Sequence, residues 1–131
     1  MKATSRLIDQ AGTALLPLYL KKEGITAYQS PEEDAYDFVV SIKNKFIRIE
    51  LKSINGESEH PTAGKVTDKQ YKATDFIIIY ILDQNQNRFY TIPTKQTPRN
   101  TSIRFTKTKD GKLNGKWAKY EGFEHLKKQI I

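Results

Sequence analysis

The sequence predicts a single α/β domain with a central mixed sheet, and three observations lead to that class. Apolar residues near the N-terminus recur at three- and four-residue spacing, as in an amphipathic helix. Short alternating runs follow, as in strands. Residues 76–82 are apolar on both faces, as a central strand must be. No repeat, linker or low-complexity segment divides the chain, so we expect residues 1–131 to form one domain.

The first expected element is a helix that ends at Gly24. Thr4 or Ser5 can cap its start. Pro17 lacks a backbone donor and crowds the carbonyl of Thr13, so we expect a kink or break there. The apolar face of this helix consists of Leu7, Ile8, Ala11, Ala14, Leu15 and Leu18.

Strands and turns are expected along the rest of the chain. Three strands, at residues 25–29, 36–42 and 45–53, precede a polar loop over residues 54–73 that ends in a short helix near residues 67–73. Later strands are expected at residues 76–82, 88–92 and 102–106, with a turn at Asp110 and Gly111 and a closing helix at residues 121–130.

The net charge of +7 lies in the C-terminal part of the chain. Residues 1–93 hold 12 basic and 12 acidic side chains, whereas residues 94–131 hold 10 basic and 3 acidic ones. Such a one-sided excess favours a polyanionic partner, most often nucleic acid, over a merely soluble surface. The expected DNA-binding residues are Lys65, Lys69, Arg99, Arg104, Lys107, Lys109, Lys112, Lys116, Trp117 and Lys119, where Trp117 either stacks on a base or packs in the core.

Composition also excludes several classes of protein. The chain has no cysteine, which excludes disulfides, thiolate metal sites and a cysteine nucleophile. The longest apolar run, residues 76–82, is too short to span a bilayer, so no membrane partner is expected. The N-terminus has no apolar signal core, so we expect a cytoplasmic protein, associated with the nucleoid if prokaryotic.

Three charged residues indicate a candidate catalytic or metal-binding site. Glu50 and Lys52 are two apart on an expected strand and project from the same face. Asp37 lies on the preceding strand, where a hairpin can bring its carboxylate beside that of Glu50. Adjacent carboxylates repel unless a cation lies between them, and Mg²⁺ prefers oxygen ligands. The carbonyl of Leu51 can supply a third ligand, and Lys52 can orient a water and stabilise charge on a phosphate. The alternative is that Glu50 and Lys52 have no chemical role. They would then be solvated on an exposed strand face or form a buried ion pair.

This arrangement resembles the PD-(D/E)XK nuclease superfamily, which is built around an Asp, a variable gap and Glu-x-Lys. The resemblance rests on residues 24–30, 36–40, 48–53 and 89–93. These segments are similar to the branch that holds the group I intron homing endonucleases, and also to the archaeal Holliday-junction resolvases. It implies a restriction-endonuclease-like α-β-β-β-α-β core with a basic C-terminal extension.

The resemblance also implies roles for individual residues. Asp37 and Glu50 would bind the metal, Lys52 would be catalytic, and Gln70 matches a polar position on the helix after Glu-x-Lys. A helix Glu that many members carry is absent near Thr13, and Asp9 or Gln10 is the candidate substitute.

The leading hypothesis is therefore a Mg²⁺-dependent DNA endonuclease, with Mn²⁺ as a substitute cation, that acts on a homing site or a branched junction. The alternatives are a non-catalytic DNA-binding protein that keeps the fold and a module whose charges serve only solubility. One active site per subunit implies a homodimer or higher oligomer for double-strand cleavage. The apolar face of the first helix, or the edge of strand 76–82, would be its interface.

Overall fold

The computed structural model describes residues 5–31 and 36–128, which form three helices, two short 3₁₀ turns and nine strands. In chain order the elements are α1 (Ser5–Lys22), β1 (Thr26–Gln29), β2 (Phe38–Ile42), β3 (Lys45–Asn55), β4 (Thr62–Ala63), α2 (Asp68–Ala73), β5 (Phe76–Asp83), β6 (Gln86–Pro93), η1 (Thr94–Gln96), β7 (Ile103–Arg104), β8 (Thr106–Lys107), β9 (Leu113–Asn114), η2 (Ala118–Tyr120) and α3 (Glu124–Lys127).

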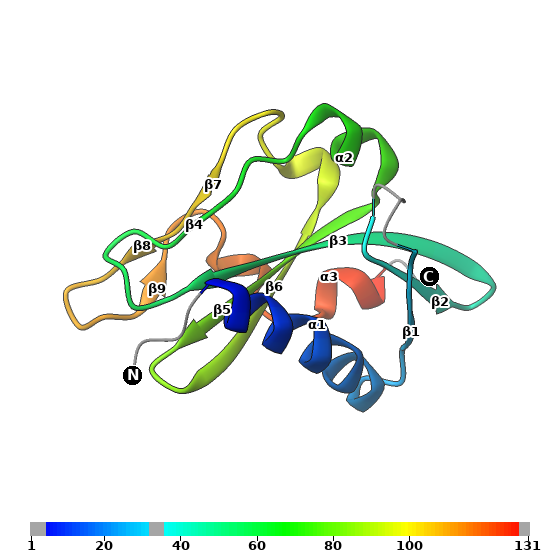
Figure 1. The fold of residues 1–131 in the computed structure, drawn as a ribbon, viewed down its shortest axis with the longest axis horizontal. Coiled ribbons are helices and arrows are strands. Elements are labelled where there is room, and N and C mark those ends of the chain that lie inside the picture. Colours follow the sequence, from blue (N-terminus) through cyan, green and yellow to red (C-terminus); the bar gives the residue numbers. More distant parts are fainter. Residues whose placement is uncertain (1–4, 32–35, 129–131) are drawn as a thin grey trace.

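A five-stranded mixed sheet with the strand order β1-β2-β3-β5-β6 forms the centre of the molecule (Figure 1). Strand β3 pairs with β5 in parallel, and the other neighbours in the sheet are antiparallel. Helices α1 and α3 cover one face, while α2, β4 and β7 lie on the other (Figure 1). The predicted α/β class and the order α-β-β-β-α-β are therefore confirmed.

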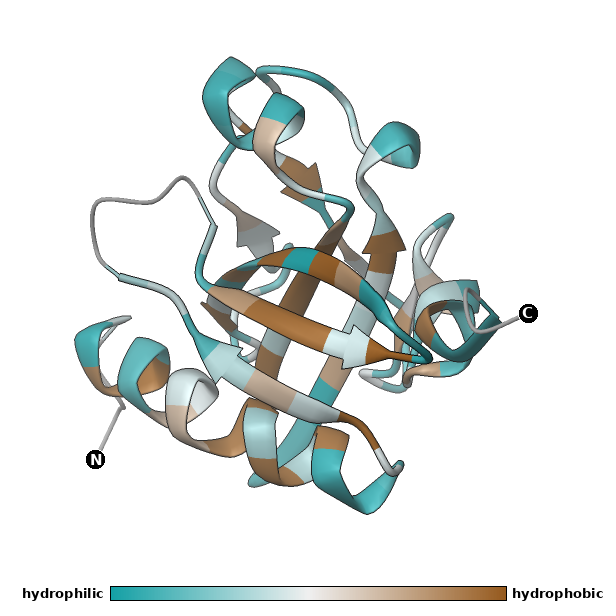
Figure 2. Cartoon of the chain, turned by 90° about the vertical axis from the view of Figure 1, so that its right-hand side faces the viewer, coloured by the Kyte–Doolittle hydropathy of each residue, from teal (hydrophilic) through white to brown (hydrophobic). Residues whose placement is uncertain are grey.

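Each face of the sheet buries its own hydrophobic core. The first core packs α1 and α3 against residues such as Ile49 and Tyr80. The second core packs the C-terminal segment against Ile77, Ile79 and Ile92. Because successive residues of β5 alternate between these cores, the strand is apolar throughout, as the sequence indicated. Figure 2 shows the resulting hydrophobic strands, which cross between helices with hydrophilic outer faces.

Helix α1 runs through Pro17 as one helix, so the expected break is wrong. Packing of Leu16 and Leu20 into the first core holds both halves of the helix against the sheet and compensates for the missing donor. The expected end at Gly24 is confirmed. Gly24 has a φ of 77°, and its N–H donates to the carbonyl of Lys21 at 3.0 Å. The capping candidate Thr4 lies outside the described residues.

One of the two proposed interfaces needs correction. The predicted apolar face of α1 is only partly used inside the subunit, because Ile8 is buried whereas Leu7 and Leu18 are 52% and 61% exposed. Strand β5 is not an edge, because β3 and β6 pair with its two sides. The interface at the edge of β5 is therefore wrong, whereas the interface on the apolar face of α1 stays a prediction.

The C-terminal part differs in detail from its predicted elements. The expected strand at residues 102–106 is divided into β7 and β8, which pair with β4 and β9. Strand β4 lies within the predicted loop, and its two residues are too few to give a periodic pattern. The closing helix is limited to Glu124–Lys127 in the part that the structure describes, and residues 129–131 lie outside it. No described helix is long and apolar enough to cross a membrane.

Candidate active site

The site lies where two strands of the sheet separate. Strands β2 and β3 pair as far as Phe38 and Ile49, and the Asp37 N–H still donates to the Ile49 carbonyl at 2.8 Å. Beyond that point β3 continues to Asn55 with β5 alone. Among the described residues, the other edge of β3 from Glu50 onward has no strand partner. We call the place where β2 and β3 separate, beyond Phe38 and Ile49, the fork. It leaves backbone and side chains accessible inside the sheet.

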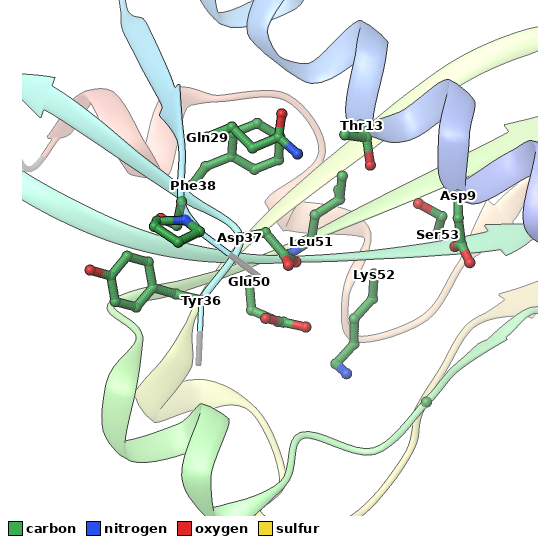
Figure 3. Close-up of a pocket in the computed structure, with 13 residues that line it drawn as sticks. Asp9, Thr13, Gln29, Tyr36, Asp37, Phe38, Glu50, Leu51, Lys52 and Ser53 are labelled. Carbon is green, nitrogen blue, oxygen red and sulfur yellow. The ribbon is translucent and has the colours of Figure 1, made fainter. Parts of the chain in front are cut away.

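A cavity of about 440 Å³ occupies the fork. Asp37, Glu50, Leu51 and Lys52 all line it, so the structure brings together four of the five residues predicted for catalysis and metal binding. Glu50 and Lys52 project to the same side of β3, whereas helix α1 lies on its other side (Figure 3). The remaining lining residues are Asp9, Thr13, Gln29, Ser30, Pro31, Tyr36, Phe38, Ser53 and Gly64.

Two hydrogen bonds orient the acidic groups. The Leu51 N–H donates to Oδ2 of Asp37 at 2.8 Å and fixes this carboxylate against the free edge of β3. The Gln70 Nε2 donates to Oε2 of Glu50 at 3.1 Å. Gln70, the fifth predicted residue, thus contacts the site through Glu50.

Gln70 is itself held by the start of helix α2. Its backbone N–H donates to the Thr67 hydroxyl at 3.1 Å, and its side-chain Oε1 accepts from the Thr67 N–H at 3.2 Å. This is a capping box, in which the N-cap and the third helical residue satisfy each other. The amide oxygen of Gln70 is therefore fixed by the helix end, and its NH₂ group is directed to Glu50.

The carboxyls at the fork crowd one another. Burial, and then the charge of Asp37, raise the pKa of Glu50 from 4.5 to about 8, although Lys52 opposes the shift. Burial lowers the pKa of the Lys52 ammonium against the attraction of Glu50 and Asp37. Burial and the charge of Asp37 also raise the pKa of Asp9. Ionisation of Glu50 in the metal-free site therefore costs free energy, and a bound cation would offset that cost.

Helix α1 reaches the site because Gly12 allows a close approach to the sheet. A Cβ atom at Gly12 would lie 2.6 Å from the Ser53 Oγ and 2.9 Å from Cδ2 of Tyr80. The next turns of the helix bring Asp9 and Thr13 to the cavity. Of the two proposed substitutes for the missing helix Glu, Asp9 lines the cavity and Gln10 does not.

The donor set suits a hard divalent cation. Asp37 and Glu50 offer carboxylate oxygens, and the backbone of Leu51 lies between the two key side chains of β3. The described residues contain no cluster of three or more His, Cys, Asp or Glu side chains that could enclose a metal. Mg²⁺ does not need one, because it binds through one or two carboxylates and keeps several waters.

The basic residues lie outside the cavity. None of the ten residues expected to bind DNA, all of which are described, lines the cavity. Lys65 and Lys69 are exposed beside Gly64 and on α2, and Arg104 is exposed on β7. Arg99 is paired with Asp68 at 2.6 Å and lies over the ring of Tyr71. The remaining exposed members are Lys109, Lys112, Lys116 and Lys119.

Two of the ten expected DNA contacts need correction. Trp117 is only 5% exposed and belongs to the second core, so its ring is not placed to stack on a base. The side chain of Lys107 is 17% exposed, and its Nζ lies 3.9 Å from Oδ1 of the buried Asp83. Its charge therefore compensates a buried carboxylate and is not free for a phosphate.

Comparison with known proteins supports the fold. The sequence matches no family model, and a search of curated proteins gives no match either. Among solved structures, the chain is similar to a bacterial homing endonuclease, I-Ssp6803I, with a TM-score of 0.73. The similarity covers 98% of this chain and 94% of that one at 15% sequence identity. At this identity the similarity shows a shared fold, and the role of each residue must be argued from the site itself.

Several lining residues were not predicted from the sequence. Ser53, Gly64 and Gln29 come from three segments that converge only in the folded chain, and their residue types carry no chemical signal. The capping box was visible in principle, since Thr67 and Gln70 have the T-x-x-Q spacing that marks a helix start. That spacing would have placed Gln70 at the beginning of a helix, but not beside Glu50.

Proposed function

We propose that this protein is a Mg²⁺-dependent endodeoxyribonuclease of the PD-(D/E)XK type, which hydrolyses phosphodiester bonds in duplex or branched DNA. The observation that carries this proposal is the convergence of Asp37, Glu50 and Lys52 in one open cavity at the fork of the sheet. On a solvated strand face, Glu50 would not have the burial that, together with the charge of Asp37, raises its pKa to about 8. The excess basic charge and the fold shared with a homing endonuclease add support.

Each residue at the fork has a distinct role in this reaction. Asp37, Glu50 and the Leu51 carbonyl would hold the cation, which supplies Lewis acidity and lowers the pKa of a bound water. Lys52 orients the attacking water and stabilises the negative charge that develops on the phosphate. Gln70 holds the Glu50 carboxylate in its ligating orientation. Water adds to phosphorus, and the P–O bond breaks to leave a phosphate and a hydroxyl.

Cleavage of both strands requires two such sites. Each subunit has one, so we propose that the active form is a symmetric homodimer or a higher oligomer. Light scattering of the protein with and without duplex DNA tests this part of the proposal, and a monomer in both states would contradict it.

The test of the activity is cleavage of supercoiled plasmid and of a four-way junction in the presence of Mg²⁺. We expect wild-type protein to cut, and Glu50→Gln and Lys52→Ala to lose the activity. Glu57→Gln, which changes an exposed carboxyl in the loop after β3, is the matched control and should cut normally. If both variants still cleave DNA, the assignment of Glu50 and Lys52 to the active site is wrong.

A non-catalytic DNA-binding protein gives a different result. Its fold and basic surface would bind DNA with a strong dependence on salt, but plasmid would remain intact with Mg²⁺ or Mn²⁺. The absence of a glutamate near Thr13 on α1 favours this second candidate. Plasmid cleavage by wild-type protein decides between the two.

A further inference from the structure

A two-stranded ribbon lies directly beside the proposed active site. Strands β4 and β7 pair Thr62 with Arg104 and Ala63 with Ile103. Ala63 and Ile103 are buried in the second core, whereas Thr62 and Arg104 are exposed. Since residues opposite each other in an antiparallel pair share a face, the hydroxyl and the guanidinium both project from the outer face of the ribbon.

The ribbon continues into the catalytic cavity. Gly64 follows β4 directly and is one of the residues that line the cavity. A second pocket, lined among others by Ser53, Thr62 and Gly64, connects the ribbon with the free edge of β3. Thr62 is two residues from Gly64, or about 7 Å along an extended chain. DNA whose backbone entered the cavity would therefore place neighbouring base pairs against the ribbon.

Arg104 differs from most other arginines of the chain. Arg48, Arg88 and Arg99 each form an ion pair, with Asp75, with Asp83 and Glu121, and with Asp68, respectively. In the part of the chain that the structure describes, the guanidinium of Arg104 has neither a hydrogen-bond partner nor an ion-pair partner. Its five donors are exposed beside the proposed active site and remain available to a ligand.

The surroundings of Arg104 suit a base edge better than a phosphate. Its exposed neighbours on the ribbon are Thr62 and Ser102, which are small and neutral. The major groove of B-DNA admits a two-stranded ribbon, and an arginine there donates two hydrogen bonds to O6 and N7 of guanine. Exposed lysines such as Lys65 and Lys109 lie outside the paired residues of the ribbon. They are suited to contacts with phosphates, which carry no sequence information.

We propose that the β4–β7 ribbon enters the major groove next to the cleavage site and that Arg104 reads a guanine there. This inference rests on the proposed function, because it takes DNA as the ligand of the neighbouring cavity, and it adds that the duplex is recognised by sequence. Since Thr62 lies about 7 Å from Gly64, which lines the cavity, we expect the guanine to be close to the cut.

The test is a binding selection from randomised duplex DNA in a Glu50→Gln background, so that the DNA stays intact. We expect the parent protein to enrich a site that contains a fixed guanine. Adding Arg104→Lys, which keeps the charge but loses the paired donors, should reduce the preference at that one base pair about tenfold or more and leave other positions unchanged. Arg104→Ala should relax the same position.

Lys112→Ala provides the matched control, because its side chain is 78% exposed on the turn between β8 and β9. It should change affinity for all sequences alike. Circular dichroism and thermal melts of each variant confirm that the fold is intact. This is expected, because Arg104 is the exposed residue of β7 and its neighbour Ile103 is the buried one.

The outcomes separate this inference from the proposed function. If the parent protein binds no DNA, the proposed function and this inference are both lost. If it selects a site and the Arg104 variants keep the same guanine preference, only this inference is lost. Uniform weakening across all sequences would mean that Arg104 contacts a phosphate, which also overturns base reading while leaving the nuclease proposal intact.

Discussion

Replacing Glu50 with Gln should stabilise the metal-free protein at alkaline pH. Burial and the charge of Asp37 raise the pKa of Glu50 in the folded state to about 8, whereas in the unfolded chain it returns to 4.5. Between these values the folded state holds a proton that the unfolded state has released. The free energy of unfolding therefore falls as pH rises from about 4.5 to about 8. Glutamine cannot ionise, so the variant does not lose this stability.

The size of the effect follows from the same two pKa values. Each tenfold change in proton affinity corresponds to ~1.4 kcal/mol, so the full span from 4.5 to about 8 gives an upper bound of roughly 5 kcal/mol. Glu50 is only half-buried in an open cavity, and solvent screening reduces the expected loss to about 2 kcal/mol. For a domain of this size that is a shift in Tm of roughly 8 °C.

The assay is urea unfolding at pH 5 and pH 8 in the presence of a chelator. The free energy of unfolding of Glu50→Gln, relative to that of wild type, should rise by about 2 kcal/mol between pH 5 and pH 8. Excess Mg²⁺ at pH 8 should restore wild-type stability, because ligation removes the repulsion, and should not affect the variant. Glu57→Gln should follow the wild-type profile. Parallel pH profiles for wild type and Glu50→Gln would refute the reasoning.

Three further predictions concern the residues that support the site. Gln70→Ala removes the 3.1 Å bond to Glu50 and should weaken Mg²⁺ binding about tenfold, measured by titrating Tm with the metal. Gly12→Ala places a Cβ 2.6 Å from the Ser53 Oγ and 2.9 Å from Cδ2 of Tyr80, so these side chains or the helix must shift, and stability should fall by about 1–3 kcal/mol in urea unfolding. Trp117→Ala empties part of the second core and should cost about 3–5 kcal/mol.

Each of these predictions has an outcome that contradicts it. Lys72→Ala, on an exposed position of α2, is the control for Gln70→Ala, and equal Mg²⁺ titrations for the two variants would deny Gln70 its orienting role. Unchanged stability of Gly12→Ala would mean that the packing of α1 against the sheet does not require a glycine at this position. If Trp117→Ala kept full stability and lost only DNA affinity, the ring would be a DNA contact after all.

Much of the central sheet could be predicted from the sequence. Strand β5 is an unbroken apolar run, and β3 alternates between core residues and charged ones, so local periodicity was enough to place both. The spacing of Glu50 and Lys52 fixed their shared face, because side chains two apart on a strand always point the same way. The expected approach of Asp37 required only a hairpin between neighbouring strands, which the structure contains.

Features that depend on distant contacts were missed or wrong. Pro17 was expected to kink or break α1, and the break is wrong because packing against the sheet outweighs one lost backbone bond. Trp117 and Lys107 were assigned to DNA from the local density of charge. Their burial is decided by partners far away in the sequence, such as Ile79 and Asp83.

The sequence alone determined which chemical groups are available and which face of its strand each one occupies, because those properties depend on residue type and on a two-residue repeat. Only the tertiary structure decided that β2 begins beside Ile49 while β3 runs on past it. It also decided that Gly12 lets α1 close over the fork, and that Gln70 reaches Glu50 from a helix 20 residues further along the chain. Such contacts join segments whose mutual distance is set by packing of the whole core, and no local pattern encodes that distance.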